Sequence, residues 1–310
     1  MKENIMTILL RYNCLDIGRL VMAFLVIGIH VGAITNTTYS PLLIAIQSMA
    51  VPFFFVCSGF FLQHKTIRTE QERHTLAAYL LKILKLFILW HLAWLPIDII
   101  FILRDNSLGL FFRNLFIEGE TYFSWHLWFL HGLLVAVAVV SLLRFIKVPL
   151  PVVWLIGLLL MWLGDAGRNG LFQGMPLVTT GMIVREYDEK LVARLPLGLL
   201  CVVLGILADI HQYPLALLLM GGGMLLVVTS VRLKDRPVYS TIRTSSMLVY
   251  FLHMYFVVLL VFLYPRLSHH SSLVYIVWGV ISMLTFLTAY VFIRLSKYND
   301  FKWLRQFMGE

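Results

Sequence analysis

Two ionisable side chains, Arg19 and His30, lie eleven residues apart in the first long apolar run of the sequence, Leu15–Ile34. Ionisable groups are costly in lipid, and in a membrane helix they mark functional sites. At 100° per residue this spacing comes within about 20° of three full turns, so both side chains project from one helix face. They are separated by roughly 16 Å along the axis, about half a hydrocarbon core. The pair therefore predicts a polar path into the membrane.

His30 lies about 15 residues into this run, where its short side chain cannot reach the interface. An imidazole buried there is expected to be neutral, the form that a general base requires. The alternative is a structural histidine bonded to a neighbouring helix. Arg19 either snorkels to the interface or joins Lys82 and Lys85, which lie near the inner end of a later apolar run. Three cations converging there would suit the phosphates of a nucleotide-bearing donor.

Further polar side chains lie in the later apolar runs. Asp98 and His126 are expected in the outer half of the membrane, where an acidic group could orient an imidazole, although Asp98 could equally be a solvated residue near the interface. Ser246, Tyr250 and His253 have the spacing i, i+4, i+7 and form one polar stripe on a helix. Lipid offers no partner for such a stripe, so we expect it to face the bundle interior and either bind substrate or join helices.

The composition is that of a membrane protein. Of 310 residues, 60% are hydrophobic and 13% are charged, whereas soluble domains are typically about 45–50% apolar and about 25% charged. Ten apolar segments follow one another without a long polar stretch. They predict a single all-α domain over residues 1–310, a polytopic bundle of about ten transmembrane helices. The expected spans are 15–34, 42–63, 79–103, 122–143, 148–164, 171–184, 191–208, 214–231, 245–264 and 273–294; the sixth is short and could be re-entrant or broken.

The distribution of Lys and Arg predicts the topology. With the N-terminus inside, the inside segments hold 18 of the 25 Lys and Arg residues and the outside segments hold four. This positive-inside bias predicts that both termini are cytoplasmic. The +9 net charge alone would suggest nucleic acid as a partner, but the Lys and Arg residues lie mainly in the inside segments between apolar spans, which excludes nucleic acid. Membrane lipids are the expected surroundings of the chain. The three cysteines lie in or beside apolar runs, which argues against a disulfide framework, and we expect no metal cofactor.

Four motifs in this order resemble the integral-membrane acyltransferase family 3, which includes bacterial surface-polysaccharide O-acyltransferases. They are Arg19-LVMAFLVIGI-His30, Val51-PFFFVCSGFF-Leu62, His126-Leu127-Trp128-Phe129 and Ser246-MLV-Tyr250-FL-His253. In the second motif, the pair Ser58-Gly59 allows a close backbone approach. The resemblance extends from about residue 12 to about residue 295. The chain departs from the family at Lys82-IL-Lys85, where Arg-x-x-Arg is common, so the charge is kept but the bidentate fork of Arg is lost.

The resemblance implies an O-acyltransferase in the bacterial plasma (inner) membrane. Acetyl-CoA or another acyl-CoA would bind from the cytoplasm with its phosphates near Arg19, Lys82 and Lys85. Its thioester would lie near His30, which would act as general base or as transient acyl carrier, and His30 and Arg19 are the expected catalytic residues. The acceptor would be a hydroxyl of a cell-envelope glycan or lipid-linked saccharide that enters from the outer side past His126.

Candidate acceptor-binding residues are Asp98, His126, Trp128, Ser246, Tyr250 and His253. The residue that orients His30 stays open between Asp98, His126 and His253. A transporter, or a membrane module that presents a solute without consuming acyl-CoA, is the alternative function, because a carrier also needs a polar path across a bundle. The sequence leaves open the acceptor glycan and whether the acyl group is acetyl or succinyl.

Overall fold

The computed structural model describes residues 12–35, 39–63, 70–105, 107–163, 171–187, 191, 193–263 and 273–309, and these residues form helices and no β-strand. Each of the ten predicted spans contains an α-helix, so the all-α prediction is confirmed. Six helical segments of the described chain are long and apolar enough to cross a membrane: Asn13–Ile34, Pro41–Leu62, His74–Arg104, Trp125–Phe145, Val238–Leu260 and Leu273–Leu295. The count of ten spans and the cytoplasmic position of both termini stay predictions.

The helices fall into two compact units. Unit 1 comprises residues 1–57 and 184–302, and unit 2 comprises residues 58–183 and 303–310. The expectation of one domain over residues 1–310 stays a prediction beside this division.

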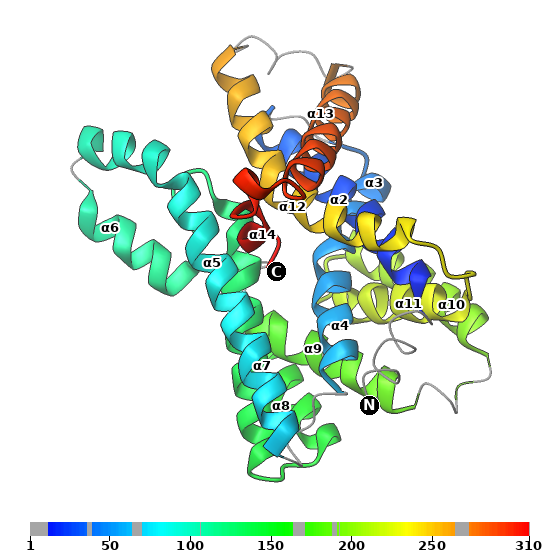
Figure 1. Cartoon of the computed structure of the whole chain (residues 1–310). Helices are drawn as coiled ribbons and strands as arrows, with labels where there is room; N and C mark the ends of the chain where they lie inside the picture. Colours follow the sequence, from blue (N-terminus) through cyan, green and yellow to red (C-terminus); the bar gives the residue numbers. More distant parts are fainter. Residues whose placement is uncertain are drawn as a thin grey trace. The chain divides into compact units, whose positions relative to one another are not determined.

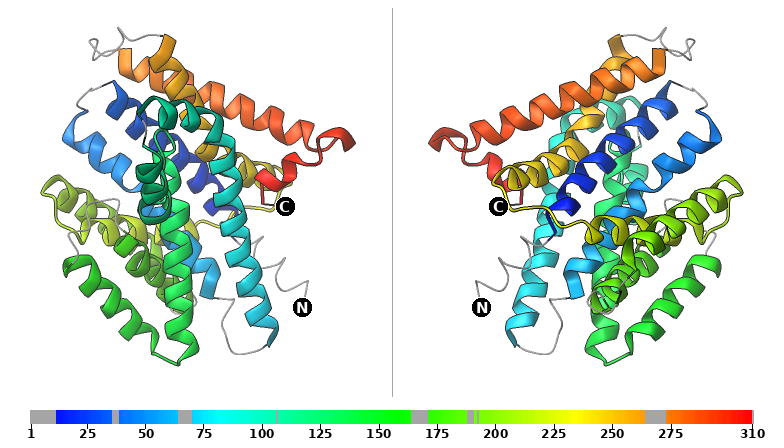
Figure 2. Two further views of the ribbon diagram at one scale, coloured as in Figure 1. Left: turned by 90° about the vertical axis from the view of Figure 1, so that its left-hand side faces the viewer. Right: turned by 90° about the vertical axis from the view of Figure 1, so that its right-hand side faces the viewer.

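Unit 1 is built around α2, which contacts α3, α11, α12 and α13 (Figure 1). The helices that lie wholly in this unit are α2 (Asn13–Ile34), α3 (Pro41–Ser48), α10 (Arg194–Ile210), α11 (Ala216–Ser230), α12 (Val238–Leu263) and α13 (Leu273–Leu295), followed by a short 3₁₀ turn at Asn299–Phe301. The views in Figure 2 show α10 and α11 side by side, and glycines allow their close packing, because a Cβ on Gly198 would lie 2.8 Å from the carbonyl oxygen of Gly223.

Unit 2 is built on α5 and α7, which pack against each other. Its helices are α5 (Glu70–Asp105), α6 (Leu108–Arg113), a π-helical turn (Asn114–Glu118), a 3₁₀ turn (Trp125–Leu127), α7 (Trp128–Phe145), α8 (Leu150–Leu163) and α14 (Leu304–Phe307). Two helices cross the boundary between the units: α4 (Ala50–Leu62) ends in unit 2, and α9 (Leu171–Glu186) begins there.

Two details differ from the expected spans. The second span is divided into α3 and α4 near Met49, because Pro52 has no N–H to donate to the carbonyl of Ser48. The sixth span is not broken over its described part, since α9 is one continuous helix although Pro176 lies inside it; whether it is re-entrant stays open. α9 is nevertheless too short to be among the six candidate spans.

Candidate functional site

The helices α2 and α12 bring His30 and His253 together. Their ring centroids are 5.2 Å apart and their planes are inclined by 38°. His253 is fully buried, and its Nδ1 lies 3.2 Å from the carbonyl oxygen of Val249. A carbonyl can only accept, so Nδ1 carries the hydrogen and Nε2 is the basic nitrogen. Of the three candidate partners of His30, His253 therefore lies against it within unit 1.

The polar stripe of α12 is divided between two places. Tyr250 is buried, with its ring 6.1 Å from that of His253 and 6.1 Å from that of Phe54. Ser246 lies nearer the start of the helix, where its hydroxyl donates to the carbonyl of Arg243 at 2.8 Å. Tyr250 and His253 thus belong to the surroundings of His30, whereas Ser246 makes a contact within its own helix.

The part of α2 that carries His30 is held by close packing on another face. A Cβ on Gly28 would lie 2.8 Å from the indole of Trp278, so only glycine lets this ring approach the helix. The indole Nε1 of Trp278 donates to the carbonyl of Phe24 at 2.8 Å, and the hydroxyl of Tyr39 donates to the carbonyl of Gly28 at 3.1 Å. These contacts fix the position of α2 and therefore that of His30.

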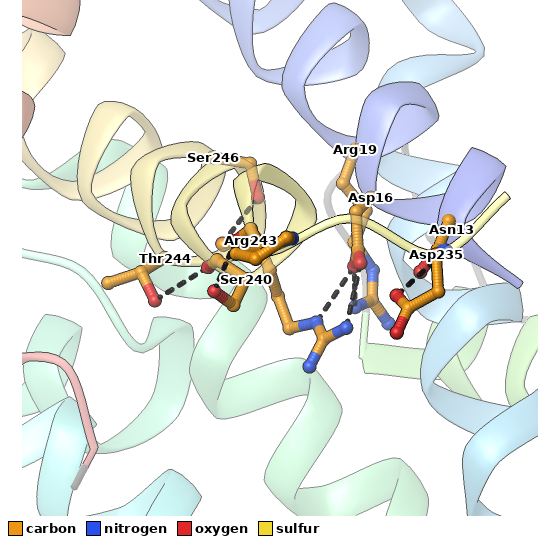
Figure 3. A network of polar contacts seen from close by, with 9 residues as sticks. Asn13, Asp16, Arg19, Asp235, Ser240, Arg243, Thr244 and Ser246 are labelled. Atoms are coloured by element: carbon orange, nitrogen blue, oxygen red, sulfur yellow. Dashed lines mark hydrogen bonds and ion pairs between the residues drawn. The ribbon is translucent and has the colours of Figure 1, made fainter. Parts of the chain in front are cut away.

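Near the start of α2, the buried carboxylate of Asp16 interacts with two arginines, Arg243 and Arg19 (Figure 3). Arg243 of α12 donates from Nε to one oxygen of Asp16 at 2.9 Å and from Nη2 to the other at 2.8 Å. Arg19 lies one turn after Asp16, with Nη1 at 3.7 Å from its carboxylate. Arg19 is also close enough to hydrogen-bond the thiol of Cys57. Arg19 is therefore part of an ionic cluster that joins α2 to α12.

Neither Asp16 nor Arg243 was predicted as a site residue. The ninth span was expected to begin at residue 245, which places Arg243 in a loop, but α12 begins at Val238. The spacing of Asp16 and Arg19 is a detectable signal, since residues i and i+3 are neighbours on a helix. The pairing of Asp16 with Arg243 has no such signal, because the two residues belong to distant segments.

In unit 2, Asp98 is buried and accepts a hydrogen bond from the Thr121 hydroxyl at 2.9 Å. The Thr121 hydroxyl also lies 2.6 Å from that of Ser124, which accepts from the N–H of Thr121 at 2.9 Å. Asp98 thus joins α5 to the segment that precedes α7. These contacts give Asp98 a structural role, and a contact between Asp98 and the acceptor stays a prediction.

The remaining predicted residues also lie in unit 2. His126 is buried and packs edge-on against Trp94, with ring centroids 6.1 Å apart, and Trp128 is buried at the start of α7. Lys82 and Lys85 are exposed on α5, where Lys82 packs against Gly309 of the C-terminal segment. Because Arg19 belongs to unit 1, its convergence with these lysines stays a prediction.

The long apolar helices, with ionisable groups on contacting faces, define a multi-pass membrane protein. A family model described as an acyltransferase domain matches residues 12–294. The chain belongs to acyltransferase family 3, as its motifs predicted.

The chain is also similar to an amino-acid racemase of Enterococcus faecalis, with 26% identity over 133 residues. This match covers 41% of the chain but only 18% of the racemase, so the chain spans a small part of that relative's length. No solved structure matches the chain.

Proposed function

We propose that this member of acyltransferase family 3 is a membrane acyltransferase. It would move an acyl group, acetyl in the first instance, from cytoplasmic acyl-CoA to a hydroxyl of a cell-envelope glycan or lipid-linked saccharide at the bacterial inner membrane. The observation that carries the proposal is the packing of the His30 ring against the His253 ring, with ring centroids 5.2 Å apart. The arginine cluster on Asp16 supports it, because it lies nearer the start of the same two helices.

The donor would bind through its phosphates. Coenzyme A carries a diphosphate and a 3′-phosphate, and guanidinium groups bind phosphate oxygens through paired charge-assisted hydrogen bonds. Arg19 is the candidate for this contact in unit 1, and Lys82 and Lys85 are candidates in unit 2. On the predicted topology, Arg19 faces the cytoplasm, where acyl-CoA is available.

The transfer would take place at His30. As a general base, His30 takes the proton of the acceptor hydroxyl while the oxygen attacks the thioester carbonyl; the C–S bond then breaks, and the proton goes to the leaving thiolate. As a nucleophile, His30 attacks the thioester carbonyl, the C–S bond breaks and coenzyme A leaves as its thiolate. The acceptor hydroxyl then attacks the acyl-imidazole, the C–N bond breaks, and the hydroxyl proton ends on the thiolate. In either route, Nε2 of His253 is the nearby basic nitrogen that can share the proton. Asp98, His126, Trp128 and Tyr250 are candidate acceptor contacts.

The test is the transfer of radiolabelled acetyl from acetyl-CoA to glycan in membranes that contain the protein. We expect His30→Ala to abolish transfer and Arg19→Ala to raise the KM for acetyl-CoA. His211→Ala is the matched control, since His211 is exposed at the end of α10, and it should leave transfer unchanged. Undiminished transfer by His30→Ala would overturn the proposed catalytic role of His30. Solute uptake without thioester cleavage would instead establish the carrier function.

An acid quench during turnover distinguishes the two routes. Label bound to the wild-type protein and absent from His30→Ala would identify the acyl-imidazole route, and its absence from both would favour general-base catalysis. Mass spectrometry of envelope glycans from cells with and without the protein would identify the acceptor and the acyl group.

A further inference from the structure

The carboxylate of Asp16 holds two guanidinium groups from two helices. Arg243 engages both of its oxygens at 2.9 and 2.8 Å, and Arg19 approaches one of them at 3.7 Å. The carboxylate is nearly inaccessible, since the Asp16 side chain is 4% exposed. The Arg19 and Arg243 side chains are 20% and 38% exposed. The acidic group is thus buried, and the two cations reach the surface of unit 1.

The buried carboxylate of Asp16 balances one of the two guanidinium charges. The second carboxylate that acts on Arg243, that of Asp235, is exposed, so solvent screens its charge. Asp16 also fixes Arg243 through two bonds in a planar fork, which removes much of the conformational freedom of a long side chain. An anion that binds there would meet two partly ordered arginines, and pre-organised groups bind at a lower entropic cost.

A purely structural role of Asp16 would not need two arginines. Joining α2 to α12 requires one arginine on Asp16, and a partly exposed ion pair stabilises a fold only slightly. The second arginine on the same carboxylate, together with the exposure of Arg243, points to a ligand with more than one negative oxygen. The phosphate groups of the acyl donor have this chemistry.

We propose that Arg243 is a second ligand for the donor phosphates, held beside Arg19 by Asp16. The proposal rests on the proposed function, because it takes acyl-CoA as the ligand of Arg19. It adds a residue of α12 to the donor site and assigns Asp16 as the residue that positions both arginines.

A second acidic residue modulates the charge of this site. Asp235 is exposed in the segment before α12, where it accepts a hydrogen bond from the Asn13 side chain at 3.3 Å and lies close enough to act on the charge of Arg243. Its negative charge would repel donor phosphates. Asp235→Asn keeps an oxygen for Asn13 and removes that charge, so the KM for acetyl-CoA should fall about twofold.

The decisive experiment compares two thioesters that differ in phosphate. Membranes carrying Arg243→Gln are assayed with acetyl-CoA and with S-acetylpantetheine, which has the same thioester arm and no phosphate. We expect kcat/KM to fall about 10- to 100-fold for acetyl-CoA, the range of one hydrogen bond to a charged group. The value for S-acetylpantetheine should change less than about twofold. Arg243→Lys should recover part of the loss, because it keeps the charge without the fork.

Arg236→Gln is the matched control. Arg236 is an exposed arginine in the segment just before α12, and its removal should leave the values for both donors unchanged. An equal loss for both donors in Arg243→Gln would show that the residue only joins helices, and an unchanged value for acetyl-CoA would overturn the proposal as well.

Binding of coenzyme A to the purified protein separates this proposal from the proposed function. If the wild-type protein consumes no acetyl-CoA, the proposed function fails, and equal affinity of wild type and Arg243→Gln for coenzyme A then overturns the inference too. Should Arg243→Gln not accumulate in membranes, Arg243→Lys and Asp235→Asn decide the matter, because the proposal requires them to shift the KM in opposite directions.

Discussion

The imidazole of His30 on α2 packs against the fully buried imidazole of His253 on α12, and the two ring centroids are 5.2 Å apart. The hydrogen bond between Nδ1 of His253 and the carbonyl of Val249 leaves Nε2 as its basic nitrogen. Two imidazoles this close can share a proton directly or through one water molecule. On the proposed function, we therefore expect His253 to share in the proton transfer at His30.

Replacement of His253 by Gln should lower kcat at least tenfold and leave the KM for acetyl-CoA nearly unchanged, because general acid–base groups contribute about 10²- to 10⁴-fold and His253 would share this work with His30. The measurement is the pH profile of kcat in membranes. A residue that only packs against His30 would lower the amount of folded protein without altering the shape of this profile. An unaltered profile would therefore contradict the prediction.

Gly59→Ala should destabilise the protein. A Cβ on Gly59 would overlap the backbone carbonyl of Val178 in α9, and backbone cannot move aside as a side chain can. This confirms the close approach predicted for Ser58-Gly59. Overpacking of this kind costs about 1–3 kcal/mol, so the melting temperature in detergent should fall by several degrees. Gly109→Ala is the control, because nothing lies within 4 Å of its added Cβ. Equal melting temperatures for the two variants would count against this account.

Thr121→Val should destabilise the junction between α5 and the start of α7. The substitution keeps the shape of the side chain but removes the hydroxyl that donates to buried Asp98, which keeps a backbone hydrogen bond at Tyr122; losing a hydrogen bond to a buried carboxyl costs about 1–3 kcal/mol. Thr121→Ser keeps the hydroxyl and should melt close to the wild type. Thermal unfolding of the three proteins tests this, and a Thr121→Ser variant as unstable as Thr121→Val would contradict the prediction, because Thr121→Ser keeps the hydroxyl and loses only the methyl group.

Glu120 should make folding sensitive to pH. Its partial burial, and secondarily the charge of Glu118, raise the pKa of its carboxyl above the ordinary value of 4.5. The folded state therefore favours the protonated form, and wild type should lose stability as the pH rises from below 4.5 through the raised pKa.

Glu120→Gln should accordingly melt slightly higher than wild type at pH 7 and at the same temperature below pH 4. Glu118→Gln should recover less of the difference, because it removes only the smaller of the two causes. A wild-type protein that gains stability over Glu120→Gln as the pH rises would have the opposite sign and would refute this prediction.

Much of this protein follows from the sequence alone. Hydropathy predicted the all-α fold, and each expected span contains a helix, because an apolar segment in lipid satisfies its backbone only by internal hydrogen bonds. Four motifs identified the family, and the family model matches almost the same residues. The boundaries were less predictable: α12 begins seven residues before the expected span, so Arg243 became a helix residue.

The pairings between distant segments needed the tertiary structure. Helical periodicity relates residues within one helix, so it could align Arg19 with His30 and Tyr250 with His253. It carries no information about which helices pack together. Only the packing of α2 against α12 selected His253 as the neighbour of His30 and gave Asp16 its second arginine. Contacts of this kind depend on the mutual rotation and depth of two helices, and these are set by the packing of all side chains at once.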